Sequence, residues 1–168
     1  NLICGKAIKI MYKVLVGTFD DVKPLWDKFL WPGRNSKRIN NWIWNLTESL
    51  PSEGRLNENI SEVTFHIVKI DDRVIGTNSV YFSNVHNKKV YYRSRGLWVA
   101  PEFRNKGIAQ LLLKSSIKTT IKNDADIIWT CPRNTSINTY NSVGFVDREV
   151  TFKNNYGINT VSFKLLKQ

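Results

Sequence analysis

A strand pattern runs straight into a helix pattern in the middle of the chain, and this junction constrains the fold more than any other feature. Residues 89–99, KVYYRSRGLWV, are typical of a long strand, with Gly96 as a possible bulge. Residues 104–109, RNKGIA, then open an apolar helix pattern that should end near Lys122. A strand that enters a helix through a tight turn directs several backbone N–H groups at one point, together with the positive end of the helix dipole. Such a turn favours the binding of phosphate or pyrophosphate.

The same residues also fit an ordinary helix start with solvated cations. Polar residues recur at every fourth position along the helix, and we expect this stripe to be solvated: Lys106, Gln110, Lys114, Lys118 and Lys122. The chain contains neither G-x-x-x-x-G-K-[ST] nor G-x-G-x-x-G. The turn alone therefore leaves both interpretations open.

Strand and helix patterns alternate along the rest of the chain. A first helix should be capped by Asp20 or Asp21 and end near Trp31, and a second should start at Ser36. Further strands are expected at 11–16, 62–70, 73–82, 125–130, 145–152 and 160–166, and a short helix at 134–142. The order β-α-α-β-β-β-α-β-α-β-β predicts an α/β fold of the α+β type, with a central mixed sheet flanked by helices.

Length and composition fit one soluble domain. The chain has 168 residues, 42% of them hydrophobic, and no run of eighteen apolar residues, so no membrane span is expected. We expect residues 11–168 to form a single domain and residues 1–10 to be an N-terminal extension, because the only methionine is Met11. Two cysteines without a metal-ligand spacing predict no disulfide framework and no metal site, and a cytoplasmic location is the expectation.

Positive charge is concentrated around the strand–helix junction. The net charge is +11, and residues 86–123 contain nine Lys or Arg but only one acid, Glu102. Such a distribution favours an anionic partner, which can be a phosphorylated ligand or a nucleic acid.

Two stretches of sequence resemble the GNAT family of N-acetyltransferases. They are GLWVAPEFRNKGIAQLLL at 96–113 and TYNSVGF at 139–145, in which a tyrosine stands four residues before Gly-Phe. The family combines an apolar strand, Pro-Glu-aromatic-Arg, and Arg/Gln-x-x-Gly-x-Gly/Ala at the start of a long helix. The resemblance implies the family's fold and acetyl-CoA as co-substrate.

The resemblance also implies roles for individual residues. The pyrophosphate would bind the loop formed by Arg104, Asn105, Lys106, Gly107, Ile108 and Ala109. The pantetheine arm would pair with the backbone of Leu97, Trp98 and Val99, and Asn134 and Ser136 are further candidates for contacts to that arm. Arg133 or a nearby lysine would meet the 3′-phosphate.

Tyr140 occupies the family's thiolate-facing position, where a phenol can donate a proton to the departing sulfur. The alternative is an aromatic residue that only packs on the sheet. No carboxylate stands on the strand at 89–99, so the proton of the amine would leave through a water chain or reach a more distant acid such as Glu62. Cys131 and His66 are expected to be structural.

The acceptor implied by the resemblance is a primary amine of a small molecule or peptide. Residues expected at its site are mostly cationic or aromatic: Arg34, Trp42, Arg93, Arg95 and Tyr156. A cationic site favours an acceptor with an anionic group beside the amine. The alternative is that these cations are solvated and aromatic side chains line the site. A homodimer is also possible.

The sequence also fits two alternatives to an enzyme. The positive charge and six tryptophans would suit a nucleic-acid-binding module, but the tryptophans do not alternate with cations on one strand, which makes nucleic acid an unlikely partner. The other alternative is a family member that binds acetyl-CoA without transferring the acetyl group. The presence of Tyr140 favours an enzyme over this second alternative.

Overall fold

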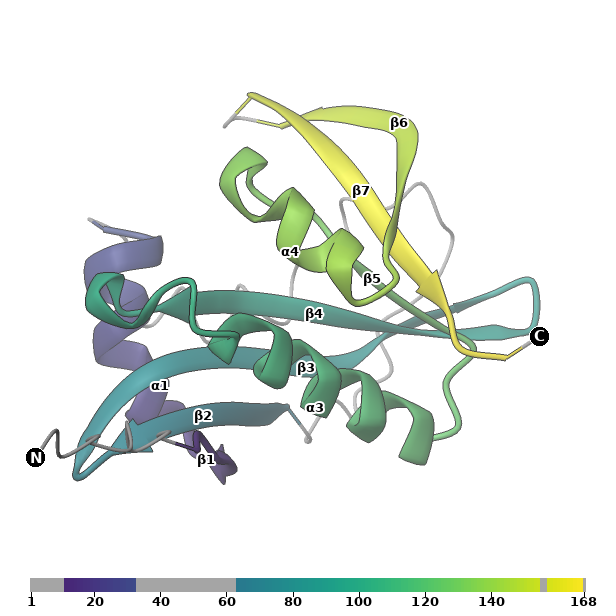
Figure 1. The fold of residues 1–168 in the computed structure, drawn as a ribbon. Coiled ribbons are helices and arrows are strands. Elements are labelled where there is room, and N and C mark those ends of the chain that lie inside the picture. Colours follow the sequence, from purple (N-terminus) through teal and green to yellow (C-terminus); the bar gives the residue numbers. More distant parts are fainter. Residues whose placement is uncertain (1–10, 33–62, 155–156, 168) are drawn as a thin grey trace, which may run out of the picture.

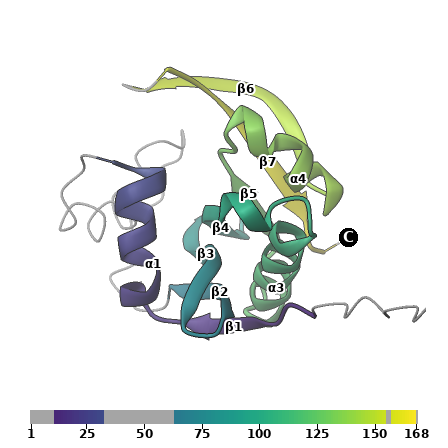
Figure 2. The same ribbon diagram turned by 60° about the vertical axis from the view of Figure 1, so that its left-hand side comes forward.

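The computed structural model describes residues 11–32, 63–154 and 157–167. A seven-stranded mixed sheet forms its centre, in the order β1-β2-β3-β4-β5-β7-β6 (Figure 1). The helix α1 covers one face of this sheet, and α3 and α4 cover the other (Figure 2). The predicted fold class is confirmed. The predicted helix from Ser36 lies outside the described residues.

The strands and helices follow one another in the predicted order. The strands are β1 (Val14–Gly17), β2 (Thr64–Ile70), β3 (Arg73–His86), β4 (Lys89–Val99), β5 (Ile127–Thr130), β6 (Val146–Asn154) and β7 (Gly157–Leu165). The helices are α1 (Phe19–Leu25), a π-helical turn η1 (Trp26–Leu30), η3 (Pro101–Phe103), α3 (Ile108–Lys122), η4 (Asn134–Ser136) and α4 (Ile137–Ser142). In the part of the chain that is described, no helix is long and apolar enough to cross a membrane.

The first helix starts earlier than predicted. Its N-cap is Thr18, not Asp20 or Asp21, and the Asp21 side chain completes a capping box with Thr18. The Asp21 carboxylate accepts from the Thr18 backbone N–H at 2.8 Å, while the Thr18 hydroxyl accepts from the Asp21 N–H at 3.4 Å. The prediction failed because both a threonine and an aspartate can cap a helix. Here Asp21 is the third helical residue, and its carboxylate accepts from the backbone of the N-cap residue.

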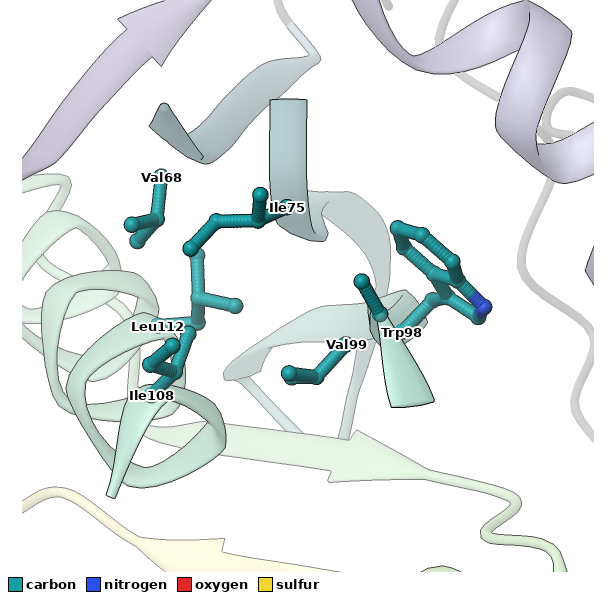
Figure 3. Close-up of a cluster of buried hydrophobic side chains, with 7 residues drawn as sticks. Val68, Ile75, Trp98, Val99, Ile108 and Leu112 are labelled. Atoms are coloured by element: carbon teal, nitrogen blue, oxygen red, sulfur yellow. The ribbon is translucent and has the colours of Figure 1, made fainter. Parts of the chain in front are cut away.

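Hydrophobic clusters fill both faces of the sheet. Val22, Trp26 and Phe65 pack under α1 and η1. On the other face Ile75 packs against Ile108 and Leu112 of α3, as Figure 3 shows. Since the first turn of α3 is anchored in this core, the position of the loop before it is fixed relative to β4.

A bulge at Gly96 interrupts the pairing of β4 with β3. Ser79 pairs with Arg95 and Thr77 with Trp98, so Gly96 and Leu97 together face Asn78. Gly96 has φ +79°, and a Cβ there would lie 2.2 Å from the Trp26 ring. The predicted bulge is confirmed, and only glycine fits it because both the backbone angle and the tryptophan exclude a side chain.

Candidate active site

The sheet opens between β4 and β5. The two strands pair in parallel only at Tyr91–Ile127, Tyr92–Ile128 and Arg93–Trp129. Beyond Arg93, β4 continues to Val99 with no strand partner on this side among the described residues. In Figure 1 the part of the sheet formed by β5, β7 and β6 angles away from this end of β4. The free backbone edge can pair with an extended ligand, in the way that an added strand would.

A cleft of about 590 Å³ lies beside this edge. It brings together residues from the end of β4, the loop before α3, and the turn that precedes α4. Nine of the residues predicted to contact acetyl-CoA line it: Leu97, Trp98, Val99, Arg104, Asn105, Gly107, Ile108, Ala109 and Ser136.

The loop before α3 forms an open cradle. Gly107 is the N-cap of α3 and has φ +80°, and Asn105 also has a positive φ of 58°. Apart from Gly107 and its two chain neighbours, no atom of the described residues lies within 4 Å of the position that a Cβ of Gly107 would take. Glycine therefore leaves space in front of the first N–H groups of a 15-residue helix, which is the arrangement that binds a pyrophosphate.

The cations around the cleft differ in their contacts. Arg104 donates from Nε to the carbonyl oxygen of Val99 at 2.9 Å, which ties this side chain to the end of β4. Arg133 donates from Nη2 to the carbonyl oxygen of Leu30, and both of these residues line the cleft. Lys106 and Asn134, which were also predicted to bind acetyl-CoA, are exposed and lie outside the lining.

Sequence reasoning missed the wall that η1 contributes. Phe29 stacks on Trp98 with ring centroids 5.0 Å apart, and Leu30 lines the cleft beside it. Phe29 is 41% exposed, so it is a large apolar side chain at the mouth of the cleft rather than part of the core. The only signal in the sequence was an aromatic residue near the end of a helix, and this does not distinguish a cleft wall from a packed core.

Tyr140 lies at the fork of the sheet but does not line the cleft. Its side chain is 2% exposed and packs against Phe145, with ring centroids 5.1 Å apart. Its Oη lies 3.4 Å from Oγ of Ser94, the first residue of β4 beyond the stretch paired with β5. Burial raises the pKa of Tyr140, against the opposing effect of hydrogen bonds with Ser94 and Thr130, so the phenol carries its proton at neutral pH.

Two arginines lie on the other face of β4. Arg93 and Arg95 are each 7% exposed, and they lie over the rings of Trp129 and Trp31 at 4.5 and 5.1 Å. Burial holds the pKa of Arg95 well below its usual value, and the positive charge of Arg93 acts in the same direction. Nε and Nη1 of Arg93 are buried and have no hydrogen-bond partner among the described residues. The other predicted acceptor residues, Arg34, Trp42 and Tyr156, lie outside those residues, as does Glu62.

Cys131 follows β5 and is a free, half-buried thiol. Burial raises its pKa, although the charges of Arg93 and Arg95 oppose this. A raised pKa makes a thiol a poor nucleophile, which agrees with a structural role. Within the described ranges, no group of three or more His, Cys, Asp and Glu side chains is placed to hold a metal ion.

Residues 30–145 match the sequence profile of the acetyltransferase (GNAT) family. The chain belongs to this family. The matched residues include the end of β4, the loop before α3, and Tyr140, so the family assignment covers the cleft described above. No curated protein sequence matches this GNAT chain at a significant level.

Solved structures of GNAT acetyltransferases share the fold. The chain aligns with a protein in the NatC complex bound to Gag peptide and CoA, with TM-score 0.70, 16% identity, and coverage of 94% of this chain and 100% of the other. Ard1 from Thermoplasma volcanium aligns with TM-score 0.66 and 14% identity, over 95% of this chain and 100% of its own. An aminoglycoside 6′-N-acetyltransferase complexed with coenzyme A aligns with TM-score 0.67 and 12% identity, over 93% of this chain and 98% of its own. At these identities the similarity concerns the fold alone.

Gly107→Val should weaken acetyl-CoA binding, because a branched side chain would fill the cradle in front of the α3 N–H groups. We expect a loss of at least ~2 kcal/mol, the cost of breaking charge-assisted hydrogen bonds to a phosphate. Calorimetric titration with acetyl-CoA measures it. The control is Gly144→Ala, since Gly144 has φ +92°, so a side chain there strains the backbone as well, but the residue lies outside the cleft lining. Normal affinity in a folded Gly107→Val variant would refute the assignment of the loop.

Proposed function

We propose that this protein transfers the acetyl group of acetyl-CoA to a primary amine of a small molecule or peptide, by direct attack in a ternary complex. The observation that carries the proposal is the convergence of three features at one fork in the sheet. These are the unpaired edge of β4, the glycine cradle at the start of α3, and the hydroxyl of Tyr140 beside Ser94.

The cleft residues suit the separate parts of acetyl-CoA. The backbone N–H groups after Gly107 would hold the pyrophosphate, and Arg104 and Arg133 add positive charge at the same cleft. The pantetheine arm would run along the unpaired edge of β4, with the Phe29–Trp98 stack as an apolar wall. The thioester at the end of the arm would then reach the fork where Tyr140 lies.

Acetyl transfer to an amine requires two proton movements. The amine nitrogen attacks the thioester carbonyl carbon, the new C–N bond forms, and the C–S bond breaks. Tyr140 would give its proton to the departing sulfur, and its buried, protonated phenol suits this role. The nitrogen would lose its proton to water or to a carboxylate outside β4 such as Glu62, because β4 offers arginines and serine in this region and no carboxylate.

The acceptor, we infer, carries an anionic group beside its amine. Arg93 supports this, because its buried Nε and Nη1 lack hydrogen-bond partners among the described residues and lie on the face of β4 opposite Ser94. Buried charge that is not paired is costly, and a bound carboxylate would offset this cost. Two neighbouring arginines would repel a polycation and attract an amino acid or an acidic peptide N-terminus.

Replacing Tyr140 by phenylalanine keeps the ring and removes the proton donor. In the Tyr140→Phe variant, turnover should fall by roughly 10²-fold, as is usual for the loss of a general acid, with little change in acetyl-CoA affinity. CoA release under saturating substrate and calorimetric titration provide the two readouts. Full turnover with chemistry as the slow step would show that Tyr140 only packs on the sheet.

A comparison of α-amino acids with their α-amides tests the acceptor class. In a panel of such pairs the free acids should show kcat/KM about ten-fold higher, because one charge-assisted hydrogen bond is worth that much. Arg93→Gln should abolish this preference, whereas Lys118→Gln, an equal loss of charge on the exposed side of α3, should keep it. Equal rates for acids and amides, or faster acetylation of aminoglycosides, would contradict the electrostatic argument.

A further inference from the structure

A chain of buried polar side chains leads from Tyr140 into the interior of the sheet. Asn78 of β3 is fully buried, and its Nδ2 donates to Oγ of Ser94 and to Oγ of Ser116, both at 2.9 Å. Ser94 lies 3.4 Å from the hydroxyl of Tyr140, and Ser116 lies 3.1 Å from Nδ1 of His66. Asn78, Ser116 and His66 do not line the cleft, so a ligand bound there would not contact them directly.

At the far end of this series of side chains, one tautomer of His66 satisfies the hydrogen bonds on both sides of its ring. Burial lowers the pKa of His66 to about 4, so the imidazole is neutral at pH 7 and one nitrogen accepts. Ser116 already accepts from Asn78, so its own proton can go to Nδ1 of His66. Nε2 of His66 then donates to Oγ1 of Thr119 at 3.1 Å. The Ser116 hydroxyl in this arm thus both accepts and donates a hydrogen bond.

The hydrogen bonds at the Tyr140 end can be assigned by counting donors in the same way. The amide group of Asn78 has two hydrogens, and both are used on the two serines. Ser94 therefore accepts from Asn78, and its own proton has two acceptors at 3.4 Å, Oδ1 of Asn78 and the oxygen of Tyr140. We assign the proton to Tyr140, because one hydroxyl aligns poorly with both ends of the same amide group. Tyr140 also forms a hydrogen bond with Thr130. A phenol oxygen that accepts from Ser94 keeps its own proton for Thr130 or, during catalysis, for the departing sulfur. Hydrogen bonds at catalytic groups are often long before substrate binds, as the 3.4 Å separation here is.

We propose that Asn78 is a positioning residue for catalysis, because it donates to Ser94, Ser94 donates to Tyr140, and the Tyr140 proton is thereby left for the departing thiolate. This inference rests on the proposed role of Tyr140 as the acid. It assigns a catalytic consequence to a residue on the neighbouring strand that touches neither substrate. It also gives a role to a polar cluster in a core where apolar side chains of similar size would pack without hydrogen-bond requirements.

Reversing the polarity of the amide tests the proposal. Asn78→Asp keeps the size of the side chain but offers only acceptors when ionised, so Ser94 would donate to it and Tyr140 would donate to Ser94. We expect kcat to fall about ten-fold, the effect of misdirecting one hydrogen bond, with unchanged affinity for acetyl-CoA. Ser94→Ala removes the link itself and should lower kcat similarly. CoA release is measured with the best amino-acid acceptor and, without acceptor, as hydrolysis of acetyl-CoA.

The decisive readout is coupling to Tyr140. In the Tyr140→Phe background, Asn78→Asp and Ser94→Ala should have no further effect on kcat, because the proton they orient is gone. Thr120→Val is the matched control. It removes another fully buried hydroxyl from α3, one that donates to the backbone carbonyl of Ser116, and it should leave kcat unchanged in both backgrounds.

Each outcome distinguishes the inference from the function on which it rests. If Tyr140→Phe lowers turnover but both variants keep wild-type kcat, or lower it by the same factor in the two backgrounds, Asn78 has no positioning role. If Tyr140→Phe itself keeps full turnover, the proposed acid is wrong and the inference fails with it. Should Asn78→Asp not fold, Ser94→Ala decides alone, since it removes a single oxygen from the same chain.

Discussion

The whole site depends on how the backbone of β4 is held once its strand pairing becomes irregular. At the Gly96 bulge, the Thr77 hydroxyl donates to the carbonyl oxygen of Gly96 at 2.9 Å and the Ser79 hydroxyl donates to that of Arg95 at 2.7 Å. Trp26 in turn donates from Nε1 to Thr77 at 3.1 Å. Buried carbonyl groups are costly without partners, so these side chains stabilise a strand that could not otherwise leave the regular ladder.

This support on the β3 side leaves the other edge of β4 available. Its pairing with β5 ends at Arg93, and the next residues point alternately to the two faces of the sheet. Ser94 faces Tyr140 and the buried amide of Asn78, whereas Arg93 and Arg95 face Trp129 and Trp31. One short stretch of strand thus separates the groups that we assign to the departing thiol from those that we assign to the acceptor.

Much of this arrangement was readable from the sequence. The turn at 104–109, the bulge at Gly96 and the order of elements follow from local patterns, because glycine, proline and hydrophobic periodicity act over a few residues. The chain of Asn78, Ser94, Ser116 and His66 was not predicted, since its members come from β2, β3, β4 and α3 and meet only through the register of the sheet. Phe29 was missed for the same reason, because its partner Trp98 is far away in the sequence.

Backbone hydrogen–deuterium exchange in the presence and absence of acetyl-CoA tests the central claim, that the fork between β4 and β5 holds this ligand. The account predicts slower exchange at residues 94–99, whose edge gains a partner, and at 106–109, whose N–H groups would bind the pyrophosphate. Residues 91–93, already paired with β5, should exchange equally in both states. If acetyl-CoA binds by calorimetry while 94–99 and 106–109 exchange at unchanged rates, the ligand lies elsewhere and the account is wrong.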